Sequence, residues 1–302
     1  QNEACDIIIG VGGGSSLDVA KGASIMATNK GGILDYVGIN LVPKRGPPTI
    51  LIPTTSGTGS EVSRALIVTD ERDMTKRAIF SDFILANVAV VDPLLTLSLP
   101  QVITAETGID ALAHAIEAYV SVNATPFSHI LAIEAIRLVA GNLFTSYSKG
   151  GDIAARFNMM LSSTLAGMAF TSGGLGAVHG LAYVIGTEYH LPHGRSIAIM
   201  LPHVMDYNKI GNLTKYAQIA QAMGESIQSL STYEAAEKSI GAVRRLLDSI
   251  NISVKLGDYG SSEADIPKLV EGGMKQTRLF VPNPRDLVEE DLKNIFLKGF
   301  RD

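Results

Sequence analysis

The stretch Gly108-Ile-Asp-Ala-Leu-Ala-His-Ala-Ile-Glu-Ala-Tyr119 places a few polar side chains in an otherwise apolar run. Its Ala and Leu content predicts a helix, on which Asp110 and His114 leave the same face one turn apart. The apolar neighbours predict that this face is buried, where an unpaired carboxylate is unfavourable and needs a cation. The pair is therefore half of a candidate divalent-metal site. On this spacing alone, however, a plain hydrogen bond between two core side chains is the more common arrangement.

Two later histidines supply the other half of such a site. His179 follows the glycine-rich Thr171-Ser-Gly-Gly-Leu-Gly176, and His193 lies between a proline and a glycine. Neither context is typical of a surface position. With Asp110 and His114 they give three imidazoles and one carboxylate, a ligand set suited to Fe²⁺ or Zn²⁺. The remaining histidines are predicted to have structural or surface roles: His129, His190 and His203.

The bulk composition is that of a globular protein. The 302 residues are 46% hydrophobic, enough for one large domain or two ordinary ones. The net charge of -5, with both signs mixed along the chain, offers no basic surface for nucleic acid or an anionic membrane. The single cysteine, Cys5, excludes a disulfide framework, and no stretch combines the length and lack of charge of a membrane span. We therefore expect a soluble cytoplasmic protein that binds neither nucleic acid nor membranes.

The first hundred residues predict an α/β domain with two glycine-rich loops. A strand over residues 6–11 leads through Gly12-Gly-Gly-Ser-Ser16 into a helix over residues 17–27. A second strand, residues 49–53, leads into Thr54-Thr-Ser-Gly-Thr-Gly-Ser60. Glycines and free N–H groups at a helix start can bind a diphosphate, although each loop can also be an ordinary turn. Further strands are predicted over residues 62–69, 76–81 and 87–92, the first two paired around the turn Asp70–Asp73.

After Pro93 the periodicity becomes helical. Nine segments have helix-like apolar spacing: 100–122, 126–147, 152–170, 175–189, 195–209, 213–223, 232–250, 264–278 and 288–300. So many successive helices must build a core of their own. We predict an α/β nucleotide-binding domain over residues 1–99 and an all-helical metal and substrate domain over residues 100–302. A strand pattern that begins at Asp6, without an initiating Met, leaves open that the α/β domain is truncated at its start.

Six ordered motifs resemble the iron-dependent (group III) alcohol dehydrogenase family. They are Gly12-Gly-Gly-Ser15 with Asp18, Pro53-Thr-Thr-Ser-Gly-Thr-Gly-Ser-Glu61, Asp92-Pro93, Asp110-x3-His114, His179-Gly180 and Pro192-His193-Gly194. The match extends to Val281-Pro-Asn-Pro-Arg285 and so covers nearly the whole chain. The resemblance implies a cleft between an α/β domain and a metal-holding helical domain. This cleft would take NAD or NADP and a small alcohol or aldehyde, in a homodimer or larger homo-oligomer.

The resemblance also implies roles for single residues. The metal ligands would be Asp110, His114, His179 and His193. The cofactor would be bound by Gly13, Gly14, Ser15 and Asp18 in the diphosphate loop, by Thr54, Thr55 and Thr58 in the second loop, and by Lys76. Two features depart from the family. Its first strand and helix, with the residue that helps to choose between NAD and NADP, would lie upstream of Gln1, and many members have a second histidine at the place of Tyr183.

These observations predict a reversible alcohol dehydrogenase, in which a metal lowers the pKa of the alcohol oxygen and the carbon passes a hydride to the nicotinamide. Tyr183, one turn after His179, is predicted to shape the pocket and orient the substrate. A phenol with a pKa of roughly 10 is a poor relay at neutral pH, so we expect the proton to leave through water or a ribose hydroxyl. Two alternatives remain: a metal-dependent hydrolase and an inactive fragment with an assembly role. Two phosphate-binding loops favour the dehydrogenase over the hydrolase.

Overall fold

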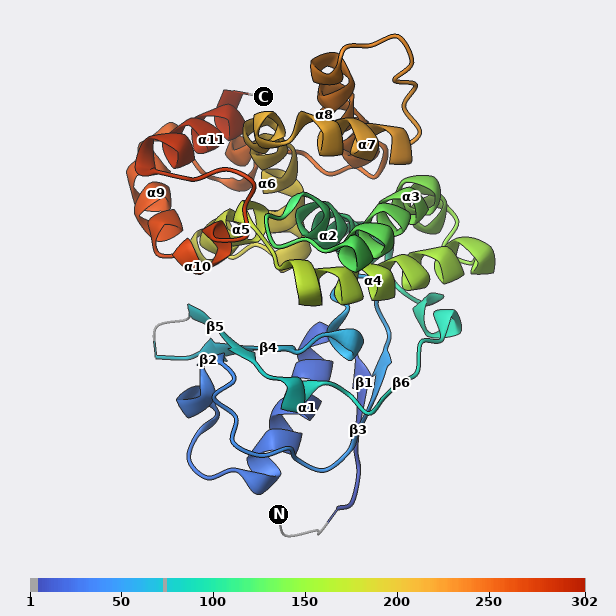
Figure 1. Cartoon of the computed structure of the whole chain (residues 1–302), viewed down its shortest axis with the longest axis vertical. Helices are drawn as coiled ribbons and strands as arrows, with labels where there is room; N and C mark the ends of the chain where they lie inside the picture. The colour runs from blue at the N-terminus through green and yellow to red at the C-terminus, as the bar shows by residue number, and fades with distance from the viewer. Residues whose placement is uncertain (1–4, 73–74, 302) are drawn as a thin grey trace.

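The protein consists of an α/β part followed by a helical part, as the sequence predicts (Figure 1). The computed structural model describes residues 5–72 and 75–301. The two parts lie one above the other, and their facing sides enclose the candidate site described below. The proposed domain division after Leu99 remains a prediction.

The α/β part contains two small three-stranded sheets. The first has the order β1 (Ile8–Gly12), β3 (Thr49–Pro53), β6 (Val88–Ala89), and all its strands are parallel. The second has the order β2 (Gly38–Ile39), β5 (Thr75–Phe80), β4 (Ala65–Asp70), with β2 parallel and β4 antiparallel to β5. The predicted pairing of two strands around a turn is therefore present as β4 and β5, although Asp73 of that turn lies outside the described residues. The last predicted strand is only two residues long.

Helix α1 (Gly14–Thr28) packs against the parallel sheet. It packs closely because residue 10 is a glycine: a Cβ there would lie 2.7 Å from the Cβ of Ala20 and 2.9 Å from Leu51 Cδ2. The helix starts three residues earlier than the sequence predicts. Gly14 and Ser15 therefore belong to its first turn, whose backbone N–H groups have no partner within the helix.

The helical part begins at Gln101. Its helices are α2 (Gln101–Val120), α3 (Pro126–Ser148), α4 (Ile153–Gly173), α5 (Ala177–Glu188), α6 (His193–Asn208), α7 (Leu213–Ala222), α8 (Thr232–Ser249), α9 (Ile266–Met274), α10 (Thr277–Phe280) and α11 (Glu289–Arg301). Short 3₁₀ helices connect elements throughout the chain: η1 (Ile33–Tyr36), η2 (Ser60–Val62), η3 (Asp82–Ile84), η4 (Pro93–Thr96), η5 (Lys209–Gly211), η6 (Leu256–Tyr259) and η7 (Glu263–Asp265).

The single helix predicted over residues 264–278 is wrong, because α9 and α10 are separate. The N–H groups of Lys275 and Gln276 donate to the carbonyls three residues earlier, those of Gly272 and Gly273. Such tight turns close α9, and glycine favours the break because it weakens a helix.

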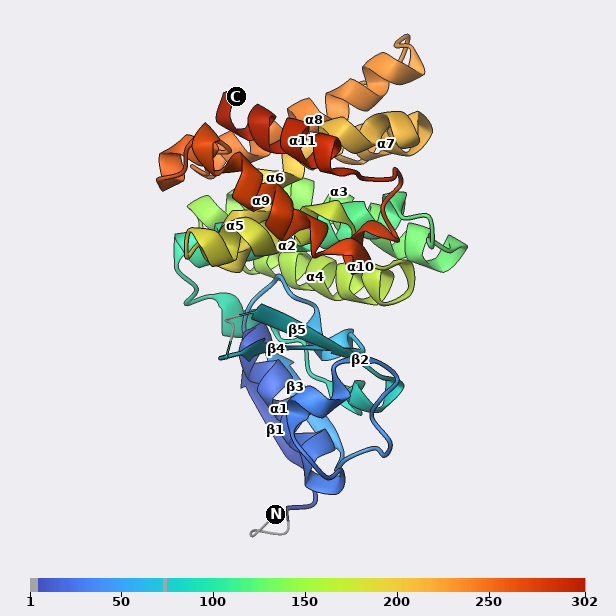
Figure 2. The ribbon, with the colours of Figure 1, turned by 90° about the vertical axis from the view of Figure 1, so that its left-hand side faces the viewer.

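Helix α2 lies at the centre of the helical part, in contact with α3, α4, α6 and α7 (Figure 2). Its apolar side chains, such as Ile109, Leu112 and Ile116, are completely buried. The polar side chains of the opening stretch are buried as well, as the sequence predicts: Asp110, His114 and Glu117.

Among the described residues one helix, α3, has the length and mean hydropathy (1.3) of a membrane span, and 39% of its apolar window is buried. Helices α4 and α5 have this character only as a pair bent by 107°. Helix α3 packs on α2 and α4 and contributes Ile136 and Val139 to the main core. Core helices of globular proteins share this composition.

Candidate active site

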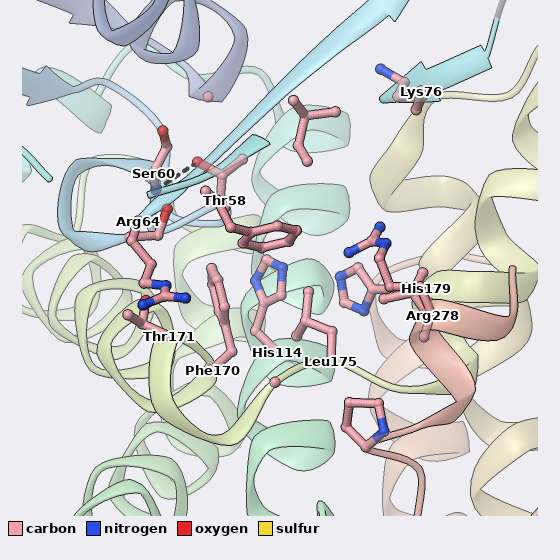
Figure 3. Close-up of a pocket in the computed structure, with 18 of the residues that line it drawn as sticks. Thr58, Ser60, Arg64, Lys76, His114, Phe170, Thr171, Leu175, His179 and Arg278 are labelled. Carbon is pink, nitrogen blue, oxygen red and sulfur yellow. Dashed lines mark hydrogen bonds between the residues drawn. The ribbon is translucent and has the colours of Figure 1, made fainter. Parts of the chain in front are cut away.

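A cavity of about 620 Å³ lies between the two parts of the protein. Figure 3 shows residues of both parts facing it: Thr58 and Lys76 come from the α/β part, and His114, His179 and Arg278 from the helical part. The predicted phosphate-binding loops follow β1 and β3 at their carboxyl ends, the position at which α/β sheets commonly bind ligands.

The four predicted metal ligands meet at one end of this cavity. The Oδ1 atom of Asp110 lies 3.7 Å from Nε2 of His114, 3.6 Å from Nε2 of His179 and 3.5 Å from Nε2 of His193. Asp110 and His114 leave α2 on one face, and His179 comes from α5 and His193 from the start of α6. Residues more than 80 positions apart in the chain thus converge on one carboxylate oxygen.

The geometry fits a divalent ion. Ligand atoms about 2.1 Å from a tetrahedral ion lie about 3.4 Å from one another, close to the distances found here but too long for good hydrogen bonds. Accordingly, Asp110 Oδ1 and His179 Nε2 are buried without a hydrogen-bond partner among the described residues. Buried polar atoms are rarely left without a partner, so these orphaned atoms favour a metal site over the hydrogen bond that the spacing alone allows.

Burial and mutual attraction shift the pKa values of the clustered side chains in different directions. Burial would raise the pKa of Asp110, but the adjacent His114, His193 and His179 outweigh this and hold that pKa far below its usual range. Burial would lower the pKa of His179, but Glu117 and Asp110 together raise it to about 9. Burial lowers the pKa of His193 to about 4, against the attraction of Asp110. Asp110 is therefore ionised at neutral pH, as a metal ligand must be.

Two of the three imidazoles are held from behind by acceptors. His114 Nδ1 lies 3.2 Å from the carbonyl oxygen of Gly57, and His179 Nδ1 lies 2.5 Å from Oε2 of Glu117. Because a carbonyl and a carboxylate only accept, each Nδ1 carries a hydrogen, which leaves Nε2 to face Asp110. Gly57 belongs to the second predicted cofactor loop, so this loop also orients a candidate metal ligand.

His193 is held differently. The start of helix α6 lies close to α2, and only glycine fits at residue 194, because a Cβ on Gly194 would lie 2.4 Å from the carbonyl oxygen of Glu106. Arg195 Nε also donates to Oε1 of Glu106 at 3.0 Å. The ring of His193 stacks on Tyr183, with centroids 5.4 Å apart. In the described part of the chain no acceptor contacts its Nδ1, and the side chain is 34% exposed, so His193 is the most accessible of the four ligands.

The cofactor end gathers only some of the predicted residues. The cavity is lined by Gly14, Ser15, Asp18, Thr58 and Lys76. The other predicted cofactor residues do not line the cavity: Gly13, Thr54 and Thr55. They join the two loops to each other, since Thr54 N donates to the Gly12 carbonyl and a Cβ on Gly13 would touch Thr55. Tyr183 and Phe170 also line the cavity, and His129, His190 and His203 do not.

Asp18 is tied into the protein by three groups. It accepts from the Ser60 hydroxyl at 2.6 Å and from Ile67 N at 3.0 Å, and Lys21 Nζ lies 3.7 Å away. Lys21 is fully buried and donates to the Ser60 hydroxyl and the carbonyls of Ser63 and Ala65. Burial lowers its pKa to about 8. This network holds α1 to the second loop, so Asp18 supports the loop as well as lining the cavity.

The sequence reasoning missed three residues here. Glu117 lies three residues after His114, a spacing on the same helical face that could have signalled it. Lys21 lies three residues after Asp18, again one turn away. Arg278 had no signal, because it lies in the helix that was predicted wrongly. Its guanidinium stacks over Phe80 at 5.2 Å, across the cavity from α10 to β5, and no carboxylate of the described residues pairs with it.

Comparison with known proteins shows the family to which the chain belongs. A model of the iron-containing alcohol dehydrogenases matches residues 1–93, and a model of the C-terminal part of the same family matches residues 104–300. The chain is 44% identical over 300 residues to the 1,3-propanediol dehydrogenase of Klebsiella pneumoniae, covering 99% of this chain and 77% of that protein.

Solved structures agree. A crystal structure of 1,3-propanediol oxidoreductase superposes with a TM-score of 0.96 at 43% identity, covering 99% of this chain and 78% of that one. The sulfoacetaldehyde reductase of Bifidobacterium kashiwanohense, solved in complex with NAD⁺, superposes with a TM-score of 0.88 at 28% identity, covering 99% and 77%.

The chain therefore belongs to the iron-containing alcohol dehydrogenase family. This membership confirms the resemblance drawn from the six motifs. It supports metal-dependent alcohol dehydrogenase activity, and the hydrolase alternative finds no support in it.

Proposed function

We propose that the protein interconverts a small primary or secondary alcohol and its aldehyde or ketone with NAD(P), using a divalent iron or zinc ion held by Asp110, His114, His179 and His193. The observation that carries this proposal is the orphaned Asp110 Oδ1, with three imidazole nitrogens 3.5–3.7 Å away inside the cavity. When bound, the metal supplies a Lewis acid that lowers the pKa of the alcohol oxygen, and the nicotinamide supplies the hydride acceptor.

The residues around the cluster position the reactants. The rings of Phe170 and Tyr183 line the cavity beside the ligands, and they leave room for a small apolar group. Burial raises the pKa of Tyr183 to about 12, so its phenol stays protonated at neutral pH and can donate one hydrogen bond to a substrate oxygen. This agrees with an orienting role for Tyr183 rather than proton transfer.

The other end of the cavity suits the cofactor diphosphate. The first turn of α1 offers free N–H groups at Gly14 and Ser15, and Thr58 adds a hydroxyl. Lys76 lies on β5 at the same cavity and forms no ion pair with a carboxylate of the described residues, so it is available to a ligand. We assign the cofactor to this end, including the loop residues Gly13, Thr54 and Thr55.

The proposed activity is tested with purified protein, a range of alcohols, and NAD⁺ or NADP⁺. We expect reduced cofactor to appear at 340 nm, to stop when a chelator removes the metal, and to return when Fe²⁺ or Zn²⁺ is added. Persistent turnover in metal-free protein would contradict the metal assignment. A complete lack of turnover in metal-loaded protein would instead favour the inactive assembly role.

We further propose a cytoplasmic homodimer or larger homo-oligomer. The single cysteine suits a reducing compartment. The assembly is what the resemblance to the family implies. Light scattering after size-exclusion chromatography tests the assembly, and a monodisperse monomer at micromolar concentration would contradict it.

A further inference from the structure

Glu117 is a buried carboxylate of α2, two turns after Asp110, with a side chain that is 4% exposed. Its Oε1 accepts from the backbone N–H of Val178 at 2.7 Å, and its Oε2 lies 2.5 Å from Nδ1 of His179. Both oxygens are thus engaged by the first turn of α5, on the side of the His179 ring opposite to Asp110. Glu117 therefore contacts a metal ligand without being one.

The contact with Val178 fixes which oxygen faces the imidazole. An N–H in the first turn of a helix has no partner within the helix, and the positive helix end favours an anion beside it. The approach depends on the missing side chain at residue 176, because a Cβ on Gly176 would lie only 3.1 Å from Oε1, closer than an ordinary van der Waals contact. With Oε1 held by Val178, only Oε2 can reach His179.

This geometry determines which ring nitrogen of His179 carries a hydrogen. A carboxylate oxygen can only accept, so Nδ1 of His179 keeps its hydrogen, and Nε2, 3.6 Å from Asp110 Oδ1, is the nitrogen that loses its proton and offers its lone pair when a metal binds. We infer that Glu117 is a positioning residue that locks His179 in its metal-binding tautomer. The inference rests on the proposed metal site and adds a fifth residue to it.

The substitution Glu117→Gln separates this role from packing, because glutamine has the same shape. The Val178 N–H needs an acceptor, so the glutamine amide turns its oxygen toward Val178 and its NH₂ group toward Nδ1 of His179. An NH₂ group donates, so Nδ1 must accept and the hydrogen of the neutral ring moves to Nε2, which then cannot bind a metal. Alanine removes the lock without enforcing the wrong tautomer, and aspartate keeps a carboxylate at greater distance.

The experiment measures the Zn²⁺ dissociation constant of metal-free full-length protein by competition with a chromophoric chelator. We expect Glu117→Gln to weaken binding by about 100-fold and Glu117→Ala by about tenfold, the range found for groups behind metal ligands. Glu117→Asp should lie between the native protein and Glu117→Gln. A matched control is Glu61→Gln: Glu61 is another buried carboxylate, its Oε1 accepts from Thr164, and within the described residues it forms no hydrogen bond with a proposed metal ligand. The zinc affinity of this variant should equal that of the native protein.

The ranking decides the outcome. If glutamine binds zinc as tightly as the native protein, or more tightly than alanine, Glu117 only fills space and caps α5, and the inference is overturned. Circular dichroism and thermal unfolding of the metal-free variants check their folding. Should Glu117→Gln not fold, native affinity in both the alanine and aspartate variants would also overturn it. A native protein that binds no zinc would overturn the proposed metal site itself, whereas unchanged affinity in the variants alone would leave that site standing.

Discussion

The two ends of the cavity are built in opposite ways. At the metal end, a carboxylate and three imidazoles from three helices converge, and Asp110, His114 and His179 are almost completely buried. At the cofactor end, the wall consists mostly of glycine, serine and threonine, and its charged residues are Asp18, which is tied to the protein by hydrogen bonds, and the exposed Lys76. The difference suggests that the metal end depends on side chains that must be present, whereas the cofactor end depends on side chains that must be small.

The largest effect is expected from Asp110→Ala. The Oδ1 atom of Asp110 lies within 3.7 Å of Nε2 of all three histidine ligands, so the substitution removes both a ligand and the negative charge that attracts the ion. Metal affinity should fall by more than about 100-fold and turnover should disappear with it. Metal analysis and the alcohol assay on the same sample check this. Retained metal with normal turnover would contradict the claim that the metal end requires the Asp110 side chain.

Lys76→Ala should have the next largest effect. Removing one charge-assisted contact to the cofactor should weaken NAD(P)H binding by about tenfold to 100-fold, with the metal content unchanged. Fluorescence titration with NADH and NADPH measures it. Unchanged affinity for both would mean that Lys76 is only a solvated strand residue.

Gly14→Ala tests whether the cofactor end is sensitive to added atoms. The new Cβ would lie 2.6 Å from Cγ2 and 2.9 Å from Oγ1 of Thr58, so Thr58 must move into the cavity. Overpacking of this kind predicts about tenfold weaker cofactor binding. Gly151→Ala is the control, since nothing lies within 4 Å of its added Cβ. Equal cofactor affinity in the two variants would show that the small residues are not required.

Tyr183→Phe should have the smallest effect. Loss of one hydrogen bond predicts a decrease of several-fold in turnover. Because burial raises the pKa of Tyr183 to about 12, the phenol does not ionise between pH 5 and 10, and the pH profile should keep its shape. Stopped-flow turnover across this pH range measures both. A loss of several orders of magnitude, with metal and cofactor bound, would make the hydroxyl the proton relay.

The contrast between the metal end and the cofactor end also explains which parts of the site the sequence could predict. The helical pattern around Asp110 and His114 predicted a buried metal half-site, because a 3.6-residue period fixes which side chains share a face. The motifs then located His179 and His193, which no local rule could bring to α2. Family resemblance likewise implied the cofactor residues, whose roles remain predictions.

Other features depend on contacts between distant segments. Glu117 binds His179 only because α5 starts against α2, and Gly57 reaches His114 only through a loop of the other part of the protein. Arg278 enters the cavity because α9 ends early and α10 turns toward β5. Periodicity describes one element at a time and carries no information on such approaches.

The most direct test of this account is a metal analysis of the native protein purified without added metal. Three imidazoles around a carboxylate oxygen that lacks a hydrogen bond should hold close to one equivalent of iron or zinc per chain, and dialysis against a chelator should remove the metal and the activity together. Full alcohol dehydrogenase activity in protein that contains no metal would contradict the central claim.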